Sequence, residues 1–173
     1  MDGVDKIFAL LKGRPLVSYC LEALHHTPEV DRIVLVLSSH NIEQGRRLVQ
    51  EYGWSKVLDV CEGGERRRDS VAVGLSRLPD SSWIIVHDGA RPFVDAELVS
   101  RGLSEARETG AAVAGVPVSD TIKVADDEHL VKETLRREGL WAIQTPQIFR
   151  RQLLAEAHET LASEFTDDAG MVE

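Results

Sequence analysis

Short apolar runs alternate with amphipathic stretches along the first two thirds of the chain. The runs at residues 32–37 and 83–86 consist almost wholly of apolar and β-branched residues, which is typical of strands covered on both faces of a sheet. Weaker runs at 56–61 and 111–116 predict two further strands. Between the runs, apolar residues recur at helical spacing, and each set gives a helix one apolar face: Leu16, Cys20, Ala23 and Leu24; Val71, Leu75 and Leu78; Val99, Leu103 and Ala106.

This strand-helix-strand repetition predicts an α/β fold built on a doubly wound, mostly parallel sheet. The 173 residues are the length of one domain with one core, and no linker or internal repeat divides them. We therefore expect a single domain over residues 1–173.

The pattern of apolar and polar residues changes between Ser119 and Gly139. Two alternating segments flank a polar turn at 126–128, which predicts a β-hairpin. Neither segment is apolar enough for the centre of a sheet, so we expect the hairpin to project as an arm that a second subunit covers. Beyond it, a helix is expected over 151–161, and Thr166 with two aspartates resembles the start of another.

Composition and charge exclude several classes of protein. The net charge of -9 and the pI near 5.2 disfavour binding to nucleic acid, which requires a basic face. Neither an apolar run of membrane-spanning length nor a signal peptide is present, so we expect a cytoplasmic protein. Cys20 and Cys61 lack the spacing of a zinc site and are interpreted as buried small residues.

Two loops that follow predicted strands carry candidate chemistry, because ligands of α/β sheets bind beyond the carboxyl ends of the strands. The first holds Gly63 and Gly64, followed by Arg67 and Ser70 at the start of a helix. Paired glycines allow a close approach of backbone to ligand, and N–H groups beside an arginine suit a nucleotide. The alternative is a plain glycine turn before a helix capped by Asp69 or Ser70.

The second loop is His87-Asp88-Gly89-Ala90-Arg91-Pro92, directly after the run at 83–86. It places a carboxylate and a guanidinium over one crevice. Asp88 can bind a divalent metal or a substrate hydroxyl, and Arg91 can pair with a phosphate. The alternative is an Asp-Gly turn with a surface ion pair between Arg91 and Asp95. Other positions are ordinary when taken singly, namely Lys6, Arg137 and the segment 145–147.

Taken together and in this order, the segments resemble the 2-C-methyl-D-erythritol 4-phosphate cytidylyltransferases, and the resemblance spans essentially the whole chain. The segments that carry it are Asp5-Lys6, Gly63-Gly64 with Arg67, Asp69 and Ser70, residues 87–92, Asp120-Thr121-Ile122-Lys123, Arg137 before Gly139-Leu140-Trp141, Thr145-Pro146-Gln147 and Thr166-Asp167-Asp168-Ala169.

The resemblance implies attack by methylerythritol phosphate on the α-phosphorus of CTP, with Mg²⁺ present and pyrophosphate released. It implies that Lys6 neutralises charge that develops on the α-phosphate, a role that suits phosphoryl chemistry. The nucleotide-binding residues it implies are Gly63, Gly64, Arg67, Ser70 and Gly89.

The resemblance further implies a homodimer with shared active sites. Arg137 and Thr121 on the hairpin would serve the partner's site, where Arg137 orients the attacking phosphate. Asp88 and Arg91 would engage the acceptor phosphate and the metal-nucleotide region, with Asp88 as the metal ligand. Thr145 and Thr166 would contact the acceptor.

The resemblance also implies segments that this sequence does not contain. Members of the family begin with a strand and a glycine-rich loop that wraps the triphosphate, and they continue past the Thr166 motif through further strands to a lysine. We therefore expect a fragment that lacks these parts. Two alternatives remain: a cytidylyltransferase acting on ribitol phosphate, and a catalytically silent nucleotide-binding domain.

Overall fold

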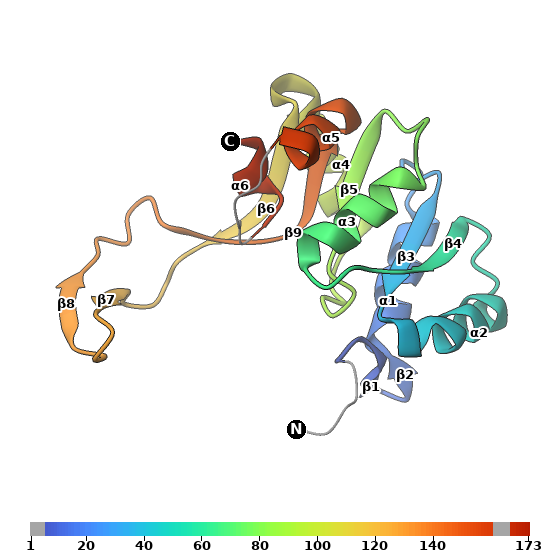
Figure 1. Cartoon of the computed structure of the whole chain (residues 1–173), viewed down its shortest axis with the longest axis horizontal. Helices are drawn as coiled ribbons and strands as arrows, with labels where there is room; N and C mark the ends of the chain where they lie inside the picture. The colour runs from blue at the N-terminus through green and yellow to red at the C-terminus, as the bar shows by residue number, and fades with distance from the viewer. Residues whose placement is uncertain (1–5, 161–166) are drawn as a thin grey trace.

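A computed structural model describes residues 6–160 and 167–173 of the chain (Figure 1). The first half contains η1 (Lys6–Phe8), β1 (Leu10–Leu11), β2 (Arg14–Pro15), α1 (Leu16–His26), β3 (Ile33–Leu37), η2 (Ser39–Asn41), α2 (Ile42–Tyr52), β4 (Val57–Glu62), α3 (Arg67–Ser76) and β5 (Trp83–Val86). The second half contains α4 (Ala96–Thr109), β6 (Ala111–Pro117), β7 (Lys123–Ala125), β8 (Val131–Thr134), β9 (Trp141–Arg150), α5 (Arg151–Thr160) and α6 (Ala169–Val172).

The predicted α/β class is confirmed, with helices on both faces of the strands. Ile148 and Phe149 are successive residues of β9, so their side chains point to opposite faces. Ile148 packs with Leu103 and Ala106 of α4, whereas Phe149 packs with residues of α3 and α5, among them Leu75 and Leu154. All the predicted strands are present. The predicted apolar faces belong to α1, α3 and α4, except that Leu78 lies just beyond the end of α3.

The strand pairing differs from the mostly parallel expectation at β9. β3 and β4 pair in parallel, but β9 lies between β5 and β6 and is antiparallel to both. The sequence interpretation predicted no strand over residues 141–150 and described Thr145-Pro146-Gln147 as ordinary loop chemistry. Proline cannot donate to a ladder, and the register between β6 and β9 shifts between Val113 and Gly115, opposite this position.

Helix α2 was likewise not predicted. Its sequence is largely polar, and it contains Gly45 in its interior. Gly45 is buried, and a Cβ atom placed there would overlap the side chain of Leu37 on β3. The glycine therefore allows close packing of helix against strand, which outweighs its low helix propensity.

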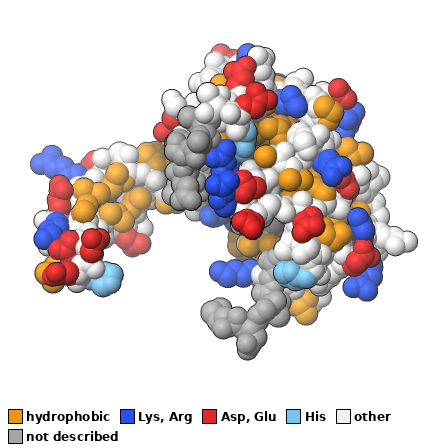
Figure 2. All heavy atoms as spheres, in the orientation of Figure 1, with side chains coloured by type: hydrophobic (Ala, Val, Ile, Leu, Met, Phe, Trp, Pro, Cys, Tyr) orange, Lys and Arg blue, Asp and Glu red, His pale blue; other side chains and the backbone are white. Residues whose placement is uncertain are grey.

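The predicted hairpin is confirmed as β7 and β8, which pair antiparallel. The arm projects from the ends of β6 and β9, away from the body of the molecule (Figure 1). Its apolar residues Val124, Leu130 and Val131 are exposed, and Figure 2 shows hydrophobic side chains gathered on the arm. Among the described helices, none has the length and apolar character needed to cross a bilayer.

Candidate active site

The glycine loop after β4 is pressed against the first turn of α3. A Cβ atom on Gly63 would lie 2.5 Å from Ser70 Oγ, and one on Gly64 would overlap the Cβ of Asp69. The N–H of Gly63 donates to the carbonyl of Leu37 at the end of β3, at 2.8 Å. Glycine is therefore required at both positions by close packing, which leaves backbone groups of the loop at the carboxyl ends of β3 and β4.

Asp69, one of the two residues predicted to cap α3, completes a capping box, whereas the N-cap position itself is Arg66. Its carboxylate accepts from the backbone N–H of Arg66 at 3.2 Å and from the Arg66 guanidinium at 3.0 Å. The hydrogen bonds from the Arg66 side chain are the main reason that the pKa of Asp69 is lowered. Arg67 is the first residue of α3, and its side chain reaches the neighbouring loop, where it pairs with Asp88.

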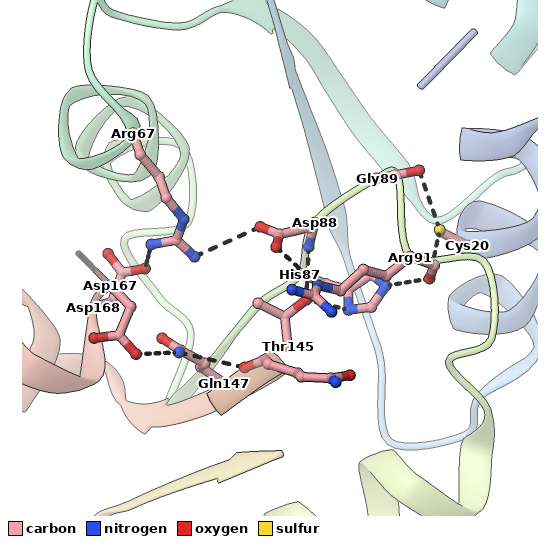
Figure 3. Close-up of polar contacts among 11 residues, drawn as sticks. Cys20, Arg67, His87, Asp88, Gly89, Arg91, Thr145, Gln147, Asp167 and Asp168 are labelled. Carbon is pink, nitrogen blue, oxygen red and sulfur yellow. Dashed lines mark hydrogen bonds and ion pairs between the residues drawn. The ribbon is translucent and has the colours of Figure 1, made fainter. Parts of the chain in front are cut away.

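The loop after β5 carries an ion-pair cluster (Figure 3). Asp88 Oδ2 lies 3.1 Å from Arg91 Nε, and Asp88 Oδ1 lies 3.7 Å from an Arg67 nitrogen. The surface-turn alternative required an ion pair between Arg91 and Asp95. Instead, Arg91 pairs with Asp88, and Asp95 caps α4 by accepting from Leu98 N–H at 2.7 Å. The structure thus brings Arg67, from the start of α3, together with Asp88 and Arg91, from the loop after β5.

Thr145 joins this cluster from β9 and contacts His87, whose contacts the sequence interpretation missed. His87 Nε2 lies 3.0 Å from the carbonyl of Arg91, which can only accept, so Nε2 carries the proton. His87 Nδ1 therefore accepts from the Thr145 hydroxyl at 3.2 Å, and that hydroxyl accepts from Asp88 N–H at 3.0 Å. Burial lowers the pKa of His87, which favours this neutral form.

The neutral state of His87 predicts a loss of stability in mild acid. Because the pKa of His87 is lowered in the folded state, the unfolded chain takes up the proton first as pH falls. The contribution is complete above about pH 6.5, the ordinary value for histidine, and it decreases as pH falls below that value. The thermal midpoint of His87→Gln should depend less on pH between about 6.5 and 5 than that of the wild type.

The matched control is His40→Gln, which replaces an exposed histidine and should leave the wild-type pH dependence unchanged. Parallel curves for the wild type and His87→Gln would show that His87 does not titrate with the predicted sign.

Cys20 anchors the same loop from α1. Its thiol lies 3.4 Å from the carbonyl of Gly89 and 3.3 Å from that of Arg91, within reach to donate to either. Burial raises the pKa of this thiol to about 11, so it remains protonated and unreactive near neutral pH. Cys20 is buried, as predicted, and also holds the backbone of the candidate site.

Lys6 lies at the start of η1 with its side chain exposed. Its neighbour Ile7 packs beside Gly89, since a Cβ atom on Gly89 would lie 3.4 Å from the Ile7 side chain. Thr121 and Arg137 lie on the arm, and Arg137 donates to the carbonyl of Ser119 at 2.5 Å. The arm is remote from this cluster within one chain (Figure 1). Thr166 lies outside the described residues.

The C-terminal motif reaches the cluster through a residue that the sequence interpretation did not single out. Asp168 pairs with Arg67, and Asp167 accepts from the buried Gln147 of β9 at 2.7 Å. A buried aspartate is not recognisable from the sequence, but the motif that contains it was among those that carried the family resemblance.

The site suits a divalent cation only in the company of substrate phosphates. Within residues 6–160 and 167–173, His, Cys, Asp and Glu side chains form no cluster of three that could hold a metal. Asp88 offers a single carboxylate, whose oxygens face two arginines. Mg²⁺ commonly uses one or two carboxylates together with phosphate oxygens, so Asp88 fits as one ligand of such a shell.

A groove of about 620 Å³ lies beside the loop, between α4 and the strands β6 and β9. Its lining includes Arg91 and Thr145 of the cluster and also exposed apolar side chains, namely Phe93, Val113 and Val116. Phe93 is 88% exposed in the isolated chain. Apolar surface of this kind is typical of a site that binds another protein surface.

Comparisons with known proteins agree on one family. A family model described as 2-C-methyl-D-erythritol 4-phosphate cytidylyltransferase (IspD) matches residues 1–173. The enzyme of that name from Dehalococcoides mccartyi strain CBDB1 is 47% identical over 173 residues, which are 100% of this chain and 76% of the relative. The one from Clostridium tetani is 38% identical, with 98% of this chain and 70% of the relative covered.

Solved structures give the same result. The 4-diphosphocytidyl-2C-methyl-D-erythritol synthase of Anaerococcus prevotii superposes with a TM-score of 0.84 at 28% identity, covering 94% of this chain and 72% of that one. The Thermus thermophilus 2-C-methyl-D-erythritol 4-phosphate cytidylyltransferase has a TM-score of 0.78 at 33% identity, covering 96% and 77%. The chain therefore belongs to the 2-C-methyl-D-erythritol 4-phosphate cytidylyltransferase family.

Proposed function

We propose that this protein transfers CMP from CTP to 2-C-methyl-D-erythritol 4-phosphate in non-mevalonate isoprenoid synthesis. An oxygen of the acceptor phosphate attacks the α-phosphorus of CTP, the bond from that phosphorus to the β-phosphate oxygen breaks, and pyrophosphate leaves. The observation that carries the proposal is the convergence of Arg67, Asp88, Arg91 and Thr145 at one rim of the strands, in a member of this family.

The cytidine nucleotide is proposed to bind against the glycine loop. Gly63 and Gly64 bring the backbone of the loop close to the first turn of α3, and the N-terminal end of a helix favours negative charge. Ser70 and Arg67 border the same turn. Gly89 is proposed to lie beside the ribose, and the lack of a side chain there lets this loop pack closely against Ile7 and Val17.

The acceptor is proposed to bind on the other side of the cluster. Arg91 and Asp88 engage its phosphate and hydroxyl groups, and Thr145 and Thr166 contact its carbon chain. A divalent cation bound at Asp88 with the triphosphate would neutralise phosphate charge and orient the leaving group. Lys6 is proposed to stabilise the charge that develops at the α-phosphate, so no covalent enzyme intermediate is required.

The arm and the groove together support a homodimer with shared sites. The exposed residues Val124, Leu130 and Val131 give the arm an apolar surface that has no cover within the described part of one chain. The groove offers complementary apolar lining next to Arg91 and Thr145. We propose that the arm of a second copy covers this region and brings its Arg137 and Thr121 to the acceptor.

Pyrophosphate release tests the function directly. With CTP and Mg²⁺, we expect turnover with methylerythritol phosphate and at least 10-fold lower kcat/KM with ribitol phosphate, roughly the discrimination that a few lost hydrogen bonds provide. Equal turnover with both acceptors would reject the proposed specificity. CTP binding with turnover of neither acceptor would favour a silent nucleotide-binding protein.

A further inference from the structure

Asp168 is a buried carboxylate with an arginine on one side and a histidine on the other. Only 1% of its side chain is exposed, whereas 36% of the side chain of Arg67, which it contacts, is exposed. His158 of α5 approaches from the other side, with Nε2 3.6 Å from Asp168 Oδ1, and its own side chain is 7% exposed. The three groups belong to three separate elements, so the carboxylate joins α3, α5 and the start of α6.

Burial of this carboxylate is compensated by its neighbours. Burial alone would raise the pKa of Asp168, and it is the largest single influence, but His158 and Arg67 together lower the pKa below its ordinary value. The carboxylate therefore stays charged at neutral pH, and a charged group in such a position requires a paired cation. Arg67 supplies that cation from the candidate active site.

The guanidinium of Arg67 uses one terminal nitrogen for Asp168 and directs the other towards the candidate active site. Nη1 contacts Asp168, and Nη2 lies 3.7 Å from Asp88 Oδ1. Asp88 in turn pairs through its other oxygen with Arg91. Charges therefore alternate from Asp168 through Arg67 and Asp88 to Arg91 (Figure 3), and a planar guanidinium that bridges two carboxylates has little freedom to rotate.

The segment that carries Asp168 is itself held in place. Asp167 Oδ2 accepts from Gln147 of β9 at 2.7 Å, and Asp167 Oδ1 accepts from Gly170 N–H at 3.0 Å. On the other side, an Arg68 nitrogen lies 3.4 Å from the carbonyl of His158. The Asp168 carboxylate is thus anchored on an ordered support, as a group that orients another must be.

We propose that Asp168 is a positioning residue. It holds the Arg67 guanidinium against Asp88, so that Arg67 and Asp88 are oriented for nucleotidyl transfer. This inference rests on the proposed function, and Asp168 itself does not touch substrate. It assigns to the C-terminal motif a role in the nucleotide half of the site, separate from the proposed contact of Thr166 with the acceptor.

The first test is Asp168→Asn, which keeps the shape of the side chain and removes its charge. We expect kcat/KM for CTP to fall by about 10- to 100-fold, because misplacement of a positioned group by about 1 Å can cost that much. The matched control is Asp59→Asn, which removes the 3.7 Å ion pair with Arg77 at the other end of α3 and should leave kcat/KM unchanged. Thermal midpoints of both variants determine whether the assay temperature lies within the folded range.

A double-mutant comparison separates positioning from general stabilisation. If Asp168 acts through Arg67, then Arg67→Ala with Asp168→Asn should be no slower than Arg67→Ala alone. Added guanidinium ion should partly restore Arg67→Ala, because the buried carboxylate still binds a cation, but it should not restore the double variant. Additive losses, or equal restoration of both variants by guanidinium, would overturn the proposal.

If Asp168→Asn fails to fold, the variant Arg67→Lys tests the positioning role instead. Lysine keeps the positive charge beside Asp168, but its single nitrogen cannot bridge to Asp88 as a guanidinium does. We expect a folded protein whose kcat/KM is lowered by about 10-fold or more, and wild-type kinetics would overturn the proposal. The wild-type protein in the same assay tests the proposed function separately: absent turnover rejects that function, whereas normal wild-type turnover with additive variants rejects only the positioning role.

Discussion

Lys6→Ala should lower kcat by about 10²- to 10³-fold while the KM for CTP changes by less than about 3-fold. The reason is that a cation aimed at charge present only in the transition state contributes to the chemical step and little to ground-state binding. Steady-state pyrophosphate release across CTP concentrations gives both constants. The expected ratio of effects assigns Lys6 to catalysis.

Lys12→Ala is the matched control, because Lys12 is an exposed lysine in the turn between β1 and β2. It should retain wild-type kcat and KM, which would exclude a general effect of net charge near the N-terminal segment. Comparable losses in kcat and in CTP affinity for Lys6→Ala would assign Lys6 to nucleotide binding instead.

Arg137→Ala should lose activity by about 10²-fold and regain it when mixed with Lys6→Ala subunits. In a mixed dimer with shared sites, one site contains both substitutions and the other contains neither. Random exchange makes half of the dimers mixed, so about a quarter of all sites should be intact. The measurement is pyrophosphate release per subunit after unfolding and refolding the two variants together.

Arg136→Ala provides the control for the arm, since Arg136 is the exposed neighbour of Arg137. It should be active alone, and its mixture with Lys6→Ala subunits should show only the average of the two separate activities. If mixed dimers of Arg137→Ala and Lys6→Ala form but show no recovery, the two residues serve the same chain's site, and the shared-site proposal is wrong.

The sequence was sufficient to identify the loops after β4 and β5 as candidate sites, but the structure was needed to identify the contacts that their residues make. The positions of Gly63, Asp88 and Arg91 after apolar runs were visible from the sequence, because the carboxyl ends of neighbouring strands place loops at one rim. The bond from His87 to Thr145 spans 58 residues, and the Arg67–Asp168 pair spans 101 residues. Sequence periodicity contains no information about partners so distant.

The sequence by itself determined the elements whose signal is local: the strands β3 and β5, the apolar faces of α1 and α4, and the hairpin. Each follows from the repeat of side chains along one segment. Only the tertiary structure decided that β9 lies at the centre of its sheet and that Asp168 is buried against Arg67. Burial of polar residues depends on partners brought together by folding. The aspartate that the sequence describes only as an acidic residue at the start of a helix is therefore a buried ion-pair partner beside the candidate active site.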